Sequence, residues 1–263
     1  MTVDWHGFNY LFSLAGFVVG MLVGITGVGG GSLMTPLLVL LFGFPPSVAV
    51  GTDLLYAAVT KAGGTLVHNW NGTVDWRLVG RLAAGSLPAT LLTLAALKFF
   101  GLRNPGTAHL ITTILGFALI LTAVSLLFRR TLQSYLAKFT ENLPEQAIGR
   151  LTVGLGAFLG FLVSISSVGA GAIGATVLIL LYPKLPMARI VGSDIAHAVP
   201  LTLIAGLGHW ALGSIDWMLL ISLLAGSLPG IAIGSQLAAY VPDRLLRTIL
   251  ASTLAVVGLR LAI

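Results

Sequence analysis

Long apolar stretches set the strongest constraint on how this chain of 263 residues can fold. A helix needs about 20 apolar residues to cross a lipid bilayer, and eight stretches have a length of that order. They are residues 8–26, 47–68, 77–100, 106–128, 147–165, 189–211, 216–238 and 245–263, and two shorter apolar runs lie at 31–44 and 171–183. Only 8% of the residues are charged, against about 25% in soluble domains. We therefore predict an all-α polytopic membrane protein with 8–10 transmembrane helices.

The charge and the residue types exclude several other classes of protein. The formal net charge is +6, but Lys and Arg gather in cytoplasmic loops of membrane proteins, so we expect no nucleic-acid partner. The chain has no cysteine, and it carries no metal-ligand cluster, Walker motif or nucleophile pattern with sensible spacing. We therefore expect no metal, no cofactor and no enzymatic activity. The first apolar run is expected to stay as a helix, not to be removed as a signal peptide.

Duplicated motifs divide the chain into two homologous halves. Gly72-Thr-Val-Asp-Trp76 recurs as Gly213-Ser-Ile-Asp-Trp217, and Gly85-Ser-Leu-Pro88 recurs as Gly226-Ser-Leu-Pro229, each 141 residues later. Near the start of each half the offset is 140, which indicates one small insertion. Such self-similarity is typical of repeat architectures. We expect a first transmembrane repeat at 1–128, a cytoplasmic linker at 129–146 and a second transmembrane repeat at 147–263.

The Lys and Arg distribution predicts that the two repeats are inverted. An odd number of crossings per half inverts the second copy, and an even number leaves it parallel to the first. If the short apolar runs cross, ten basic residues lie on the cytoplasmic side and three outside, whereas short runs that dip and return give seven against six. The positive-inside bias favours five crossings per half, with both chain ends outside. The ten are Arg77, Arg81, Arg129, Arg130, Lys138, Arg150, Lys184, Arg189, Arg244 and Arg247, and the three are Lys98, Arg103 and Arg260.

Two glycine-rich breaks occupy matching positions in the halves, at 24–32 and 164–172. Each glycine weakens a helix interior by about 1 kcal/mol relative to alanine, so the chain is expected to unwind there. Unwound backbone at membrane depth lines a protein-enclosed cavity, and a following helix N-terminus attracts anions. The alternative is close helix packing through small residues. The predicted substrate-binding residues of the breaks are Thr26, Gly29, Gly30, Gly31, Ser32, Ser166, Ser167, Gly169 and Gly171.

Four ionisable residues lie within apolar spans, where charged groups usually mark substrate or proton pathways. Lys61 is the deepest, and we expect its ammonium either to attract an anion, to lose its proton, or to pair with Asp53 or Asp194. The two aspartates occupy equivalent positions and are predicted to act in gating or proton coupling, with helix N-capping as the alternative. His197 shares the helix face of Asp194 and is predicted to relay protons, or to be a packed, hydrogen-bonded histidine.

The remaining motifs have structural explanations. The motifs at 72–76 and 213–217 are predicted to be turns that lead into helix N-caps with an interfacial tryptophan. The motifs at 85–88 and 226–229 are predicted to be proline kinks. His68 and His209 lie beside Trp70 and Trp210 at helix ends, so we expect both histidines at the membrane interface.

The order and duplication of these motifs resemble the TauE/SafE sulfite exporter family. The resemblance is carried by Gly27-Val-Gly-Gly-Gly-Ser-Leu-Met-Thr-Pro-Leu38, by Val50-Gly-Thr-Asp53 and by the same frame after residue 160. It implies an inner-membrane permease for sulfite, organosulfonates or related sulfur oxyanions and, in some members, small carboxylates. The second half departs from the first, because Ser164, Ser166 and Ser167 replace glycines.

Together these features predict a secondary transporter that exports sulfite or an organosulfonate. Alternating access coupled to protons or to the membrane potential is the expected mechanism. The alternatives are a passive anion channel, a permease for a carboxylate or sulfate, and a membrane-embedded enzyme or assembly factor. The expected partners are the small anion and the lipid bilayer of the bacterial inner membrane, and a homo-oligomer is left open.

Overall fold

The computed structural model describes residues 10–26, 31–102, 104–140, 143–237 and 243–262. In these residues the chain forms ten helices and no strand. The helices are α1 (Tyr10–Thr26), α2 (Gly31–Leu40), α3 (Pro46–Trp70), α4 (Trp76–Phe100), α5 (Pro105–Thr140), α6 (Glu145–Ser166), α7 (Ala172–Leu181), α8 (Met187–Ala211), α9 (Trp217–Leu237) and α10 (Asp243–Ala262). Each helix matches one of the ten predicted apolar segments, so the predicted helical class is confirmed.

Helix lengths separate the spans from the shorter pieces. Five helices are long and apolar enough to cross a membrane by length and composition: α4, the 105–128 part of α5, α6, α8 and α9. The helix α5 continues to Thr140, through much of the segment 129–146 that we predicted as a linker. The short helices α2 and α7 have ten residues each. At 1.5 Å per residue, each alone covers about half of a hydrocarbon core of about 30 Å.

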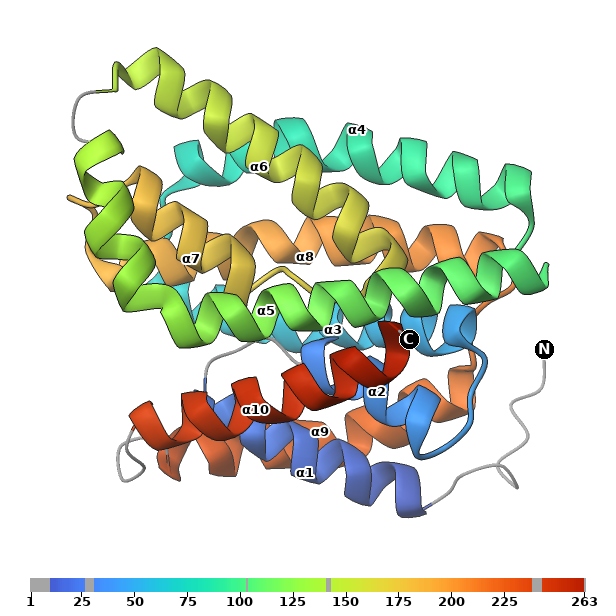
Figure 1. Cartoon of the computed structure of the whole chain (residues 1–263). Coiled ribbons are helices and arrows are strands. Elements are labelled where there is room, and N and C mark those ends of the chain that lie inside the picture. The colour runs from blue at the N-terminus through green and yellow to red at the C-terminus, as the bar shows by residue number, and fades with distance from the viewer. Residues whose placement is uncertain (1–9, 27–30, 103, 141–142, 238–242, 263) are drawn as a thin grey trace.

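Equivalent helices of the two halves exchange partners across the bundle. The helix α1 packs along α9, and its counterpart α6 packs along α4. The helices α3 and α8 occupy equivalent positions and pack against each other at the centre. The equivalent helices α5 and α10 also pack against each other. In Figure 1 the pairs α4/α6 and α1/α9 lie on opposite sides of the bundle. The two halves are therefore interlocked, and neither encloses the centre by itself.

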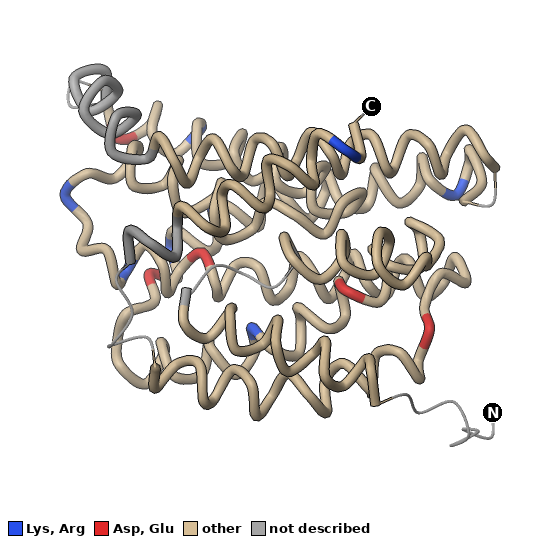
Figure 2. The backbone as a smooth tube through the Cα atoms, turned by 60° about the horizontal axis from the view of Figure 1, so that its bottom comes forward, with Lys and Arg blue, Asp and Glu red and all other residues tan. Residues whose placement is uncertain are grey.

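Counterpart helices run in opposite directions in Figure 1. The helix α5 starts at the end of the bundle where α1 starts and runs away from it, whereas α10 runs toward that end. The helices α1 and α6 are opposed in the same way. This is the relation that an inverted repeat requires, and its orientation in a membrane stays a prediction. Figure 2 shows more Lys and Arg positions at one end of the bundle than at the other.

Two crossed hydrogen bonds tie the halves together at equivalent positions. The backbone amide of Asp75 donates to the hydroxyl of Ser193 at 2.8 Å, and that of Asp216 donates to the hydroxyl of Thr52 at 3.2 Å. The carboxylate of Asp75 accepts from the first backbone amides of α4. These turns therefore cap their helices as predicted, and they also dock on the opposite half.

Close helix contacts depend on glycine where α1 meets α9 and where α4 meets α6. An added Cβ at Gly226 would overlap the carbonyl oxygen of Ser13, and one at Gly85 would overlap that of Val153. Small residues let helix backbones approach each other in membranes, where no hydrophobic effect drives helices together. The motif that we interpreted as a proline kink therefore also supplies the contact residue of each helix pair.

Polarity is reversed relative to that of a soluble protein. Large apolar side chains point outward, among them Phe99 at 86% exposed and Leu92 at 72% exposed. Polar residues such as Thr35, Asp53, Ser86, Asp194 and His197 are at most 2% exposed. Soluble monomers rarely expose apolar patches of this size to water. In a membrane protein the bilayer covers them. The polar groups that matter for function are therefore inside the bundle.

Candidate functional site at the centre of the bundle

The second glycine-rich break is unwound, as predicted. The helix α6 ends at Ser166, and α7 begins at Ala172. Ser167 has a φ of 58°, while Gly169 and Gly171 have φ of 120° and 122°, a region that side chains rarely allow. In Figure 1, α7 starts in the middle of the bundle and runs to the end away from the start of α1. The break thus places a helix N-terminus inside the protein.

Asp194 of α8 lies over that N-terminus of α7. The backbone of Gly171 lies close enough to act on its carboxylate, and an added Cβ at Gly174 would overlap its Oδ1. A carboxylate is favoured at this position because the N-terminal turn of a helix carries free N–H groups and a positive dipole end. An internal anion therefore already occupies the anion-attracting end of α7.

Asp53 of α3 makes the corresponding contact in the first half. Its Oδ2 accepts a hydrogen bond from the hydroxyl of Thr35 in the short helix α2. The hydroxyl of Ser167, from the second break, also lies close enough to act on this carboxylate, although Oδ1 of Asp53 has no hydrogen bond of ordinary geometry. Each buried aspartate thus reaches the short helix of its own half.

Lys61 connects the two halves of the site. Its ammonium donates a hydrogen bond to the carbonyl oxygen of Ala170 in the second break at 3.2 Å. Asp194 and Asp53 both act on it electrostatically, yet the ion pairs within 4 Å in the described part of the chain are those of Glu145 with Arg77 and Arg81. Because an ammonium has three N–H donors, Lys61 keeps donors for a further acceptor, and the alternative of a direct structural ion pair is not observed.

His197 is a packed, hydrogen-bonded histidine, which is the alternative to a proton relay in the sequence analysis. Its Nε2 lies 2.8 Å from the hydroxyl of Ser86 in α4, and both residues are fully buried. Its Nδ1 has no hydrogen-bond partner in the described ranges of the chain. One helical turn of α8 separates it from Asp194, so it lines the same interior.

The other predicted substrate-binding residues lie farther from the centre or are not among the described residues. The hydroxyl of Ser166 is used within its own helix end, at 2.7 Å from the carbonyl oxygen of Leu162. Ser32 lies 5% exposed in the first turn of α2 and lines a cavity of about 350 Å³ between α1, α2 and α10. Gly29 and Gly30 lie outside the described residues, as does the side chain of Thr26, and Gly31 is the first residue of α2.

One alternative and one prediction are wrong. The helices α3 and α8 begin at Pro46 and Met187, so Asp53 and Asp194 lie inside their helices and do not cap them. His209 is not at the interface, because it is fully buried and its Nε2 lies 2.9 Å from the carbonyl oxygen of Ser164. The reason is the interlocking of the halves, which packs the end of α6 over the last turns of α8.

Several residues of the centre were not identified from the sequence. Thr35, Ser86 and Gly174 contact Asp53, His197 and Asp194 respectively. Ser86 belongs to a duplicated motif, which was a usable signal. Thr35 and Gly174 lie in short apolar helices, where a single small or hydroxyl residue carries no pattern that marks it.

The fold and this centre define a polytopic helical membrane protein whose interior polar site is built from two homologous halves. A family model described as sulfite exporter TauE/SafE matches residues 12–261, and the chain belongs to this family. It is 41% identical over 249 residues to the probable membrane transporter protein YjnA of Bacillus subtilis, covering 94% of this chain and 97% of that protein. It is 26% identical over 253 residues to the probable membrane transporter protein YdhB of the same organism, covering 95% and 99%. No solved structure matches the chain. The chain is thus a multi-pass membrane transporter protein, as its predicted class required.

Proposed function

We propose that this protein is a secondary transporter that exports a small sulfur-containing oxyanion, sulfite or an organosulfonate, through the central site. The observation that carries this proposal is Lys61, whose ammonium reaches from α3 into the unwound break of the other half. A partly buried cation that has no ion pair within 4 Å among the described residues, beside a helix N-terminus, favours an anionic substrate. The family description adds the sulfur oxyanion.

The substrate would bind between Lys61 and the second break. Its oxygens would accept hydrogen bonds from the ammonium, from the hydroxyl of Ser167 and from backbone amides near Gly169 and Gly171. Ser167 suits this role, because its hydroxyl is buried and makes no hydrogen bond of ordinary geometry within the part of the chain that the structure describes. Ser32 and Ser166, with the first break, would complete the site from its edges.

Asp194 would act as an internal competitor of the substrate. Its carboxylate occupies the N-terminal turn of α7, which is where an oxyanion would gain most from the helix dipole. Proton binding to Asp194, or its movement away from α7, would vacate that place. Asp53 makes the equivalent contact with α2, so the two aspartates would gate from the two halves in turn, which is how an inverted repeat produces alternating access. His197 would carry protons beside Asp194.

Uptake of radiolabelled sulfite by proteoliposomes tests this proposal. Saturable uptake that sulfite and organosulfonates compete for, with counterflow exchange, is the expected result. Sulfate, thiosulfate, sulfoacetate and acetate would be the competitors. Flux without saturation or exchange would favour a channel, and preference for acetate or sulfate would favour a different small anion. Absence of flux for every anion from folded protein would contradict the proposed function.

A further inference from the structure

A second polar cavity lies away from the central site, between the first turns of α4 and α6. Its volume is about 600 Å³, and its polar lining consists of Arg77, Arg81, Glu145, Gln146 and Arg150. None of these residues contributes to the central site. In Figure 1 both helices start at the end of the bundle that lies away from the start of α1.

Positive charge is in excess in this cavity. Nη2 of Arg77 and Nη2 of Arg81 lie 3.2 and 3.3 Å from the same oxygen, Oε1 of Glu145. Arg150 has no ion pair or hydrogen bond within the residues that the structure describes. A guanidinium carries five N–H donors, so three guanidinium groups share one carboxylate and most of their donors are unused.

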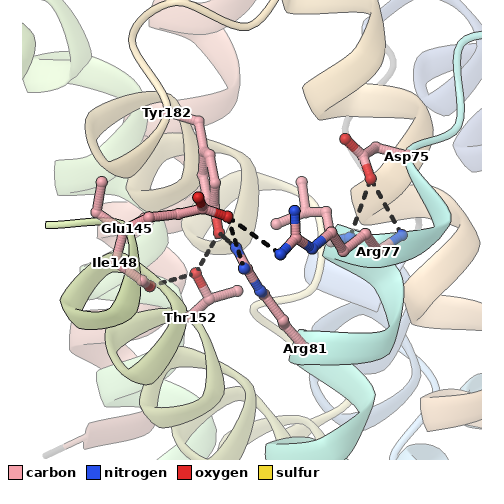
Figure 3. Close-up of polar contacts among 8 residues, drawn as sticks. Asp75, Arg77, Arg81, Glu145, Ile148, Thr152 and Tyr182 are labelled. Atoms are coloured by element: carbon pink, nitrogen blue, oxygen red, sulfur yellow. Dashed lines mark hydrogen bonds and ion pairs between the residues drawn. The ribbon is translucent and has the colours of Figure 1, made fainter.

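One of the three guanidinium groups is held in place by a chain of hydroxyl groups. Arg81 donates to the hydroxyl of Tyr182 at 3.2 Å, which lies 2.8 Å from the hydroxyl of Thr152. Figure 3 shows the Glu145 carboxylate lying between the side chains of Arg77 and Arg81. The side chain of Arg77 is 74% exposed and that of Arg81 only 23%. A held arginine at the base and an exposed one at the rim can both donate to the same ligand.

We propose that this cavity binds an oxyanion of the sulfate or phosphate type, which takes the place of the Glu145 carboxylate. Guanidinium groups bind such anions through paired N–H donors, and the N-terminus of α6 adds its positive dipole end on the same side. The ligand is either the phosphate of an anionic lipid or a free oxyanion in solution. Because Tyr182 directly follows α7, an anion bound to Arg81 is linked to the short helix that starts at the central site. This second site does not depend on which anion the central site transports.

The test compares purified full-length protein in nanodiscs of neutral phosphatidylcholine and in nanodiscs that also contain phosphatidylglycerol. The midpoint of thermal unfolding is measured against sulfate concentration in the first and against phosphatidylglycerol content in the second. The variants are R77Q/R150Q, with K98Q/R260Q at the other end of the helices as the control of equal charge change. E145Q removes the competing carboxylate.

We expect one of the two ligands to stabilise the wild type saturably. R77Q/R150Q should need about tenfold more of it, K98Q/R260Q should respond as the wild type, and E145Q should need less. An effect of sulfate in neutral nanodiscs assigns a free oxyanion, and an effect of phosphatidylglycerol alone assigns a lipid headgroup. The opposite effects of R77Q/R150Q and E145Q separate binding from general damage to the fold. The proposal is overturned if neither ligand stabilises the protein, or if R77Q/R150Q responds as the wild type does.

Discussion

The ammonium of Lys61 lies 3.2 Å from the carbonyl oxygen of Ala170, so a side chain of the first half donates a hydrogen bond into the unwound break of the second half. Asp53 and Asp194, one from each half, act electrostatically on the same ammonium. Three charged groups in a low-dielectric interior are coupled strongly. A change in the charge of any one of these three residues should therefore alter the affinity of the central site for an anion.

Replacing the buried aspartates by asparagine should strengthen anion binding and weaken its pH dependence. Each substitution removes a negative charge that opposes an anion near Lys61, so D53N and D194N should each lower the KM by about fivefold or more. Initial rates of sulfite uptake into proteoliposomes over a series of pH values measure both effects. If both variants kept the wild-type KM and pH profile, the gating and proton-coupling role would be wrong.

Gly174→Ala should impair transport mainly through Asp194, because the other neighbour of the added Cβ, Cδ1 of Leu159, lies farther away at 3.2 Å. The added methyl group would overlap Oδ1 of Asp194 and displace the carboxylate from the first turn of α7. Gly154→Ala is a matched control in the neighbouring helix α6, because an added Cβ there meets nothing within 4 Å. Uptake assays should show a loss for G174A and wild-type rates for G154A. Equal rates for the two variants would contradict the placement of Asp194 against the first turn of α7.

Gly226→Ala should destabilise the packing of α9 against α1. Its Cβ would overlap the backbone of Ser13, and the movement of a side chain cannot relieve a clash with backbone atoms. Overpacking of this kind lowers the stability by about 1–3 kcal/mol. Gly80→Ala, in α4, has open space around the new methyl group and should be neutral or slightly stabilising. Thermal unfolding in detergent compares them, and a G226A protein as stable as G80A would contradict the close backbone approach.

Apolar length and internal repetition were sufficient to predict the helices of this protein. All ten segments were located from hydropathy, because a helix in a bilayer must satisfy its own backbone. The turns at Asp75 and Asp216 were predicted from local capping chemistry, since the carboxylate and the amides that it caps are two or three residues apart. Local interactions of this kind can be recognised from residue spacing.

Contacts between the halves could not be predicted in the same way. His209 looks interfacial in sequence because it is next to Trp210, but its environment is set by Ser164, 45 residues away. The bond from Lys61 to Ala170 joins residues 109 apart. A repeat offset shows which residues are equivalent, but it does not show that equivalent helices exchange partners across the bundle.

The most direct test of the central site is sulfite uptake by proteoliposomes that hold the wild type, Lys61→Ala or Lys98→Ala. Lys98 is an exposed lysine in the last turn of α4 and serves as the matched control. Loss of a charge-assisted hydrogen bond to the substrate should raise the KM of Lys61→Ala by about tenfold or more, while Lys98→Ala transports as the wild type does. Uptake by Lys61→Ala with an unchanged KM, from protein that is folded and inserted, would contradict the account.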